Sequence, residues 1–255
     1  MIGALDLGAG DLLLFGAGTV LLLLYLGLRI AGRDPLAGNP SPPGRARELE
    51  AFAVLLLSIL VQVFVAGGLA AVGRAGETTI VLAATAAATA VAGMAALMLL
   101  RGAGPAGPAV RGAGAGVLGF VASFPVVATV LLGWKALLSD LGGSTAEQPI
   151  LTSLRADLPV FFLVAVIGAP LSEEIIFRGL LHGALRRRFG MAVAAIISAA
   201  IWAAVHRHLP TAPAHFVLGV ALSLTYEKTG TLWGPIAFHA AFNGWQFAQV
   251  AAGGR

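Results

Sequence analysis

The stretch LSEEIIFRGLL, Leu171–Leu181, places two adjacent glutamates and an arginine inside a long apolar run. A charged residue at the centre of a bilayer-spanning helix costs at least about 2.5–3.5 kcal/mol on insertion scales. Three such residues are tolerated when they pair with one another and face the interior of a helix bundle. The stretch therefore predicts a polar interior within an apolar, helical protein.

Composition supports this class. The chain has 255 residues, of which 58% are hydrophobic and 11% charged, and its mean hydropathy is +0.90. A soluble domain carries about 25% charged residues, so the chain is expected to be an integral membrane protein. Cysteine is absent, which excludes disulfides, thiolate metal sites and a cysteine nucleophile. The arginines fall mostly between apolar runs, as topogenic charges do, so no nucleic-acid partner is expected.

Hydropathy predicts an all-α membrane fold: a polytopic bundle of about eight transmembrane helices around a polar intramembrane cavity. Residues 1–157 would hold the first four helices with their linkers, and residues 158–250 the last four, within one structural unit. The expected spans are Leu12–Leu28, Ala51–Val72, Thr78–Leu100, Gly116–Leu138, Leu158–Leu185 (kinked by Gly168 and Pro170), Met191–His206, Pro213–Tyr226 and Leu232–Val250.

Positive charge predicts the orientation. Asp6 and Asp11, and no positive charge, precede the first span, which favours an uncleaved helix with its N-terminus outside. Eight spans would then leave more basic residues inside than outside, as the positive-inside rule requires. The inside set is Arg29, Arg33, Arg45, Arg47, Arg101, Arg111, Arg186, Arg187, Arg188 and Lys228, and the outside set is Arg74, Lys135, Arg155, Arg207 and Arg255.

Helical spacing separates the roles of the two glutamates. Glu174 and Arg178 are four positions apart, on one face of a helix, and can form a charge-assisted pair. Glu173 is rotated from Glu174 by about 100° and would remain available for chemistry. The alternative interpretation is a structural salt bridge that joins two helices.

Two further spans carry polar side chains that belong in such an interior. The segment IWAAVHRH places His206 at the end of the sixth span, one turn after Trp202, and FHAAFNGW places His239 and Asn243 on one face of the eighth. The remaining histidines are less central. His182 and His208 lie near span ends, where solvated interfacial positions are expected, and His215 could line the same cavity in a supporting position.

Glutamate with histidine is a general-base combination that can activate water, and a second histidine with an asparagine can stabilise an oxyanion. The set Glu173, His206 and His239 could instead bind zinc, whose catalytic sites use three protein ligands and a water. Neither a HExxH nor a GxSxG motif is present. Both mechanisms would hydrolyse an acyl bond.

With these motifs in order, the chain resembles the CPBP family of intramembrane endopeptidases, which includes the type II CAAX prenyl protease and bacterial Abi-type proteins. The family pattern EExxxR, FxxxH, HxxxN reads here EEIIFR (Glu173–Arg178), WAAVH (Trp202–His206) and HAAFN (His239–Asn243). The resemblance covers residues 158–249, and Trp202 replaces the expected phenylalanine.

The resemblance implies an eight-helix fold with a conical cavity open to the bilayer. It also implies that Glu173 and His206 activate water, that His239 and Asn243 hold the oxyanion, and that Glu174, Arg178 and Trp202 support them. It leaves open whether a zinc ion takes part. The implied partners are the lipid bilayer and a membrane protein or lipid-associated peptide as substrate, in the inner membrane of a bacterium.

Two other functions fit the composition. A proton-coupled transporter could use buried Glu, Arg and His as a relay, although no second EE segment marks an inverted repeat. A non-catalytic membrane scaffold or immunity protein of the same fold would not need the full polar set. For a peptidase, the sequence leaves the substrate open among a prenylated CAAX protein, a pheromone or bacteriocin peptide, and a C-terminal sorting tail.

Overall fold

The computed structural model describes residues 8–33, 48–73, 77–99, 109–146 and 158–253, and within these ranges the chain is helical and contains no strand. Helices occupy all eight predicted positions, which confirms the all-α class. The elements are α1 (Ala9–Ile30), α2 (Glu48–Val72), α3 (Glu77–Leu99), α4 (Ala109–Asp140), α6 (Leu158–Phe161), η1 (Phe162–Gly168), α7 (Ala169–Glu174), η2 (Ile175–His182), α8 (Gly183–Val205), η3 (Leu209–Thr211), α9 (Ala212–Thr229) and α10 (Trp233–Gly253).

Four helical stretches of the described chain are long and apolar enough to cross a membrane, so this is a multi-pass membrane protein. They are 9–30, 49–72, 109–140 and 158–205. The last has 48 residues and turns at Gly190, where φ is 79° and ψ is 172°. A positive φ suits glycine, which has no Cβ. The turn separates the predicted fifth and sixth spans.

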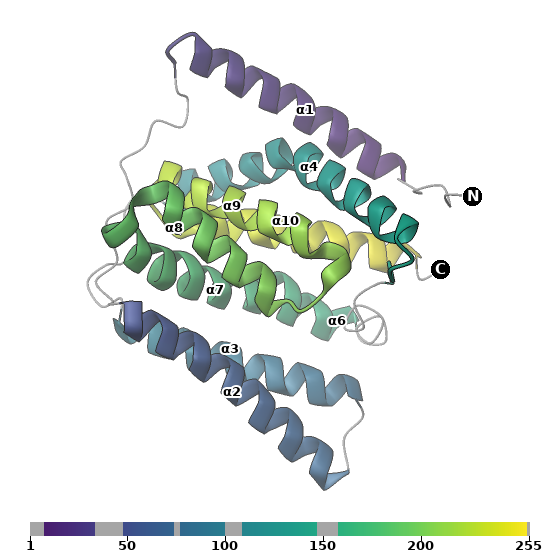
Figure 1. Cartoon of the computed structure of the whole chain (residues 1–255), viewed down its shortest axis with the longest axis vertical. Helices are drawn as coiled ribbons and strands as arrows, with labels where there is room; N and C mark the ends of the chain where they lie inside the picture. Colours follow the sequence, from purple (N-terminus) through teal and green to yellow (C-terminus); the bar gives the residue numbers. More distant parts are fainter. Residues whose placement is uncertain (1–7, 34–47, 74–76, 100–108, 147–157, 254–255) are drawn as a thin grey trace.

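The helices form a central body with one attachment on each side (Figure 1). The central body contains α4 and the elements from α6 to α10, in which α4 packs against α9 and α10, and α8 against α9. Helix α1 lies along α4 on one side. The pair α2 and α3 lies on the opposite side, against α7 and the π-helices. The central body carries the polar residues of the predicted site.

Small residues set the closest helix contacts. A Cβ at Gly116 of α4 would lie 2.0 Å from the carbonyl oxygen of Gly234 in α10, and one at Gly18 of α1 would lie 2.2 Å from the carbonyl oxygen of Val121. Glycine therefore lets the backbones of α4 and α10, and of α1 and α4, approach closely, as small residues do between membrane helices.

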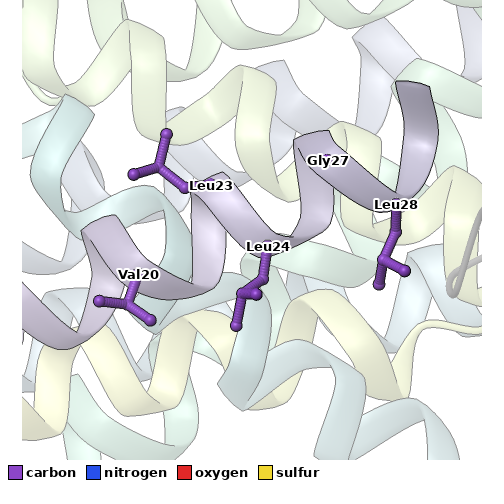
Figure 2. A pocket seen from close by; sticks show the side chains of 5 residues that line it. All are labelled: Val20, Leu23, Leu24, Gly27 and Leu28. Carbon is purple, nitrogen blue, oxygen red and sulfur yellow. The ribbon is translucent and has the colours of Figure 1, made fainter. Parts of the chain in front are cut away.

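The outer surface is apolar, as lipid contact requires. Helix α1 exposes several large side chains: Leu12, Leu13, Val20, Leu23, Leu24, Leu26, Leu28 and Ile30. A shallow hollow on this helix is lined by Val20, Leu23, Leu24, Gly27 and Leu28 (Figure 2). All five belong to one helix and none is charged, so we interpret the hollow as part of the lipid-facing surface.

Some sequence predictions fall outside the described residues. These are Leu100, the boundary at residue 157, and six arginines of the charge count: Arg45, Arg47, Arg74, Arg101, Arg155 and Arg255. The orientation therefore stays a prediction.

Candidate functional site

The two glutamates lie on α7, a short α-helix between two π-helices. A π-helix bonds each N–H to the carbonyl five residues earlier, and π-helical turns frequently occur at functional sites. Pro170, in the first turn of α7, has no backbone N–H to donate. Just before it, the carbonyl of Ala165 in η1 accepts a hydrogen bond of 2.7 Å from Nδ2 of Asn243 in α10. The π-helix η1 and the last helix, α10, are thus joined by a hydrogen bond.

Glu174 forms the pair that the four-residue spacing predicts. Its Oε1 accepts a hydrogen bond from a terminal nitrogen of Arg178 at 2.9 Å, and both side chains are fully buried. The same oxygen lies 2.9 Å from Nδ1 of His239. Arg178 also donates to the carbonyl of Gly219 at 3.0 Å. Charge pairing and hydrogen bonding together offset the cost of burying this carboxylate and guanidinium.

Glu173 points to a different partner. Its Oε2 accepts a hydrogen bond of 2.6 Å from the indole N–H of Trp202, in the last turn of α8. The two carboxylates therefore diverge as the 100° rotation predicts: Glu174 binds Arg178 and His239, while Glu173 binds Trp202.

The environment of His206 defines its tautomer. Nδ1 of His206 lies 2.8 Å from the carbonyl oxygen of Trp202, one helical turn earlier. A carbonyl only accepts, so Nδ1 carries the proton and, in the neutral ring, Nε2 is left with a lone pair. The imidazole stacks on His215, with centroids 4.3 Å apart and an interplanar angle of 27°. His206 is thus held ready to accept a proton through Nε2.

His239 is oriented in the same way by a different acceptor. Glu174 is paired with Arg178 and accepts, so Nδ1 of His239 donates and Nε2 faces away from the carboxylate. The ring centroid of His239 lies 5.5 Å from that of Trp202. With Nδ1 donating to Glu174, Nε2 can donate as well only when the ring carries a second proton.

We call the residues joined by these contacts the polar cluster: Glu173, Glu174, Arg178, Trp202, His206 and His239. Asn243 lies one helical turn after His239 and is tied to Ala165. His215, expected only as a supporting residue, stacks directly on His206. The hydrogen bond from Trp202 to Glu173 is one of the contacts that the sequence did not predict, because helical spacing says nothing about partners on another helix.

The zinc alternative concerns the side chains of Glu173, His206 and His239. Among the residues that the structure describes, no three His, Asp or Glu side chains are grouped so that they could hold a metal ion. Nδ1 of both His206 and His239 is engaged by an acceptor, as it is in histidines that bind a metal through Nε2.

A second buried polar group lies away from the cluster. Nε2 of His182 lies 2.7 Å from Oε1 of Glu227, which is also 2.7 Å from Nε of Arg186. His182 is completely buried, so the expectation of a solvated interfacial histidine was wrong: the α8–α9 contact covers it. His208 is half-buried and bonds to Thr211 and to the carbonyl of Ala146.

Comparison with known proteins points to the same part of the chain. Residues 155–245 match the family model "Type II CAAX prenyl endopeptidase Rce1-like". The chain is 33% identical over 100 residues to YdiL of Bacillus subtilis (strain 168), a membrane peptidase by its name, covering 39% of this chain and 41% of the relative. It is 36% identical over 94 residues to the membrane-embedded CAAX protease MroQ of Staphylococcus aureus (strain USA300), covering 34% and 38%.

The match thus spans about two fifths of the length of these curated relatives. No solved structure matches the chain. The matched segment contains the whole polar cluster, together with His215 and Asn243. Residues 155–245 of this membrane protein are therefore similar to the Rce1-like type II CAAX prenyl endopeptidases.

Proposed function

We propose that this chain is an intramembrane endopeptidase that hydrolyses a peptide bond near the C-terminus, or within the membrane segment, of a protein or lipid-associated peptide. One observation carries the proposal. Glu173 and His206 meet at the same tryptophan, one at its indole N–H and the other at its carbonyl, and Nε2 of His206 is left as a proton acceptor. A carboxylate and an imidazole placed together in this way form a general-base pair for water.

The proposed reaction needs one water and no covalent enzyme intermediate. The second oxygen of Glu173, with Nε2 of His206, takes a proton from the water while its oxygen attacks the substrate carbonyl carbon. The C=O bond becomes an oxyanion, which accepts hydrogen bonds from Nε2–H of protonated His239 and from the second amide N–H of Asn243. When the carbonyl re-forms, the C–N bond breaks, and the abstracted proton goes to the leaving amine.

Glu174 and Arg178 support this reaction through His239. Their ion pair presents a fixed acceptor to Nδ1 of His239, which holds the ring in place. Arg178 in turn anchors α9 through the carbonyl of Gly219. These contacts bring α7, α9 and α10 together at one point in the bundle.

The membrane setting extends the proposal. We place the protein in the inner membrane of a bacterium, with its N-terminus outside, and expect a bacterial client such as a peptide or a C-terminal sorting tail. The bacterial relatives and the positive-charge bias support this setting.

Comparative membrane proteomics tests the function. A deletion strain, and the same strain carrying Glu173→Gln, should accumulate the same uncleaved membrane proteins or peptides, which should disappear when the wild-type chain is restored. Asp140→Asn is the control, because Asp140 is an exposed acid at the end of α4. Complementation by the Glu173→Gln chain would show that this carboxylate is not the base.

Treatment with a chelator distinguishes activation of water by Glu173 and His206 from activation by a zinc ion. Because the cluster does not form a three-ligand group, we expect purified enzyme to keep its activity after dialysis against a strong zinc chelator. Loss of cleavage that added Zn²⁺ restores would instead support the zinc mechanism.

A further inference from the structure

The side chain of Trp202 lies against several other residues of the polar cluster. It is 1% exposed, and its ring centroid lies 4.4 Å from that of His206 and 5.5 Å from that of His239. The guanidinium carbon of Arg178 lies 5.3 Å from the same ring, within the range of a cation–π contact. The indole therefore lies beside three other residues of the polar cluster: Arg178, His206 and His239.

The fold makes room for this large ring. A Cβ at Gly219 of α9 would lie 2.9 Å from Cβ of Ala199 and 3.3 Å from Cε3 of Trp202. Glycine at this position lets α9 approach the indole face, and its carbonyl accepts the bond from Arg178. The space for the indole and the anchor for the arginine thus depend on the same glycine.

The indole N–H distinguishes Trp202 from the phenylalanine that the motif FxxxH carries. Both rings fill space and contact neighbouring rings, but only tryptophan has a donor. That donor binds Oε2 of Glu173 at 2.6 Å. A carboxylate with one oxygen fixed can no longer rotate freely, so its second oxygen has one defined position.

We propose that Trp202 is a positioning residue in this chain: its indole N–H fixes the Glu173 carboxylate so that the free oxygen faces the same water as Nε2 of His206. The inference rests on the proposed peptidase function. It assigns to the substitution of phenylalanine by tryptophan a role in orientation, in addition to packing.

Trp202→Phe isolates this role, because it keeps an aromatic ring and removes the donor. We expect kcat for cleavage to fall by about 10- to 100-fold, less than the roughly 10²- to 10⁴-fold that general-base catalysis contributes in full, with KM unchanged within about twofold. Trp245→Phe is the matched control: its indole N–H also binds a carboxylate, Oδ1 of Asp11 at 3.1 Å, outside the cluster. That variant should keep wild-type kcat.

A spectroscopic readout makes the test independent of turnover. The chain has four tryptophans, so ¹⁵N-tryptophan labelling in detergent micelles should give four indole signals. The indole signal that is absent from the Trp202→Phe spectrum belongs to Trp202. In the wild-type protein it should lie at low field, and in Glu173→Gln its chemical shift should change, while that of Trp245 stays the same. This measurement also applies if a variant is inactive for other reasons.

The outcomes are separable. Three results would each overturn the inference. They are a wild-type kcat in Trp202→Phe, an equal loss of kcat in Trp245→Phe, and a Trp202 indole signal that does not shift in Glu173→Gln. If Glu173→Gln cleaves as fast as wild type, Glu173 is not the base and the role of the indole fails with it, whereas a wild-type chain that cleaves nothing would overturn the proposed function itself. If Glu173→Gln is inactive and Trp202→Phe is fully active, only the role of the indole is wrong.

Discussion

Glu174 and His239 share a hydrogen bond of 2.9 Å although 65 positions separate them in the chain. The same carboxylate oxygen holds Arg178, and all three side chains are buried. One glutamate therefore fixes an arginine of its own helix and a histidine of the last helix.

Glu174→Gln should destabilise the protein strongly, because it leaves the fully buried Arg178 without its counter-charge. Removing one partner of a buried pair costs about 3–5 kcal/mol. Titration of unfolding with SDS in mixed micelles measures the change. Asp140→Asn should change the unfolding free energy by less than about 0.5 kcal/mol, and equal stability of the two variants would show that the buried pair does not hold the helices.

Gly116→Ala should weaken the contact between α4 and α10, since the new methyl group would lie 2.0 Å from the carbonyl oxygen of Gly234. We expect a lower thermal unfolding temperature in detergent. Gly114→Ala on the same helix is the control, because a Cβ there meets nothing within 4 Å and alanine favours the helix. A similar loss in both variants would contradict the close approach.

Asn243→Ala should lower stability as well as activity. It leaves the partly buried carbonyl of Ala165 without its donor, and an unsatisfied acceptor costs about 1–3 kcal/mol when it is fully buried. Unfolding in micelles and cleavage are measured on the same preparation. Gln246→Ala, on the same helix but outside the polar cluster, should affect neither. Full stability of Asn243→Ala would limit the amide to a role in the reaction.

His215→Ala should slow cleavage by up to about tenfold, because ring pairs contribute about 0.5–1.5 kcal/mol and the stack of 4.3 Å holds His206. His215→Phe keeps a ring and should recover most of the rate. The measurement is kcat for both variants. If phenylalanine is as harmful as alanine, the nitrogens of His215 matter and stacking is not its role.

Local spacing predicted the parts of this site that lie on one helix. The pair of Glu174 with Arg178 follows from a separation of four residues, and the divergence of Glu173 from the rotation between neighbours. Hydropathy alone predicted where the described chain is helical.

Contacts between different helices could not be predicted from the spacing of residues within one helix. Neither the indole donor to Glu173 nor the amide donor to Ala165 leaves a pattern in the sequence, since the partners lie 29 and 78 positions apart. The burial of His182 was missed for the same reason: a span end was expected to be solvated, but Glu227 of α9 covers it. Hydropathy reports the preference of a segment for lipid and contains no information on which helix lies beside it.

The contact between Asn243 and Ala165 has a further consequence. It joins α10 to η1, the segment that precedes the two glutamates, and so it sets the register of the last helix along this part of the chain. Pro170 leaves the same segment one backbone donor short, and the side-chain amide supplies a tie from a neighbouring helix. The register of α10 decides which of its side chains lie level with the carboxylates.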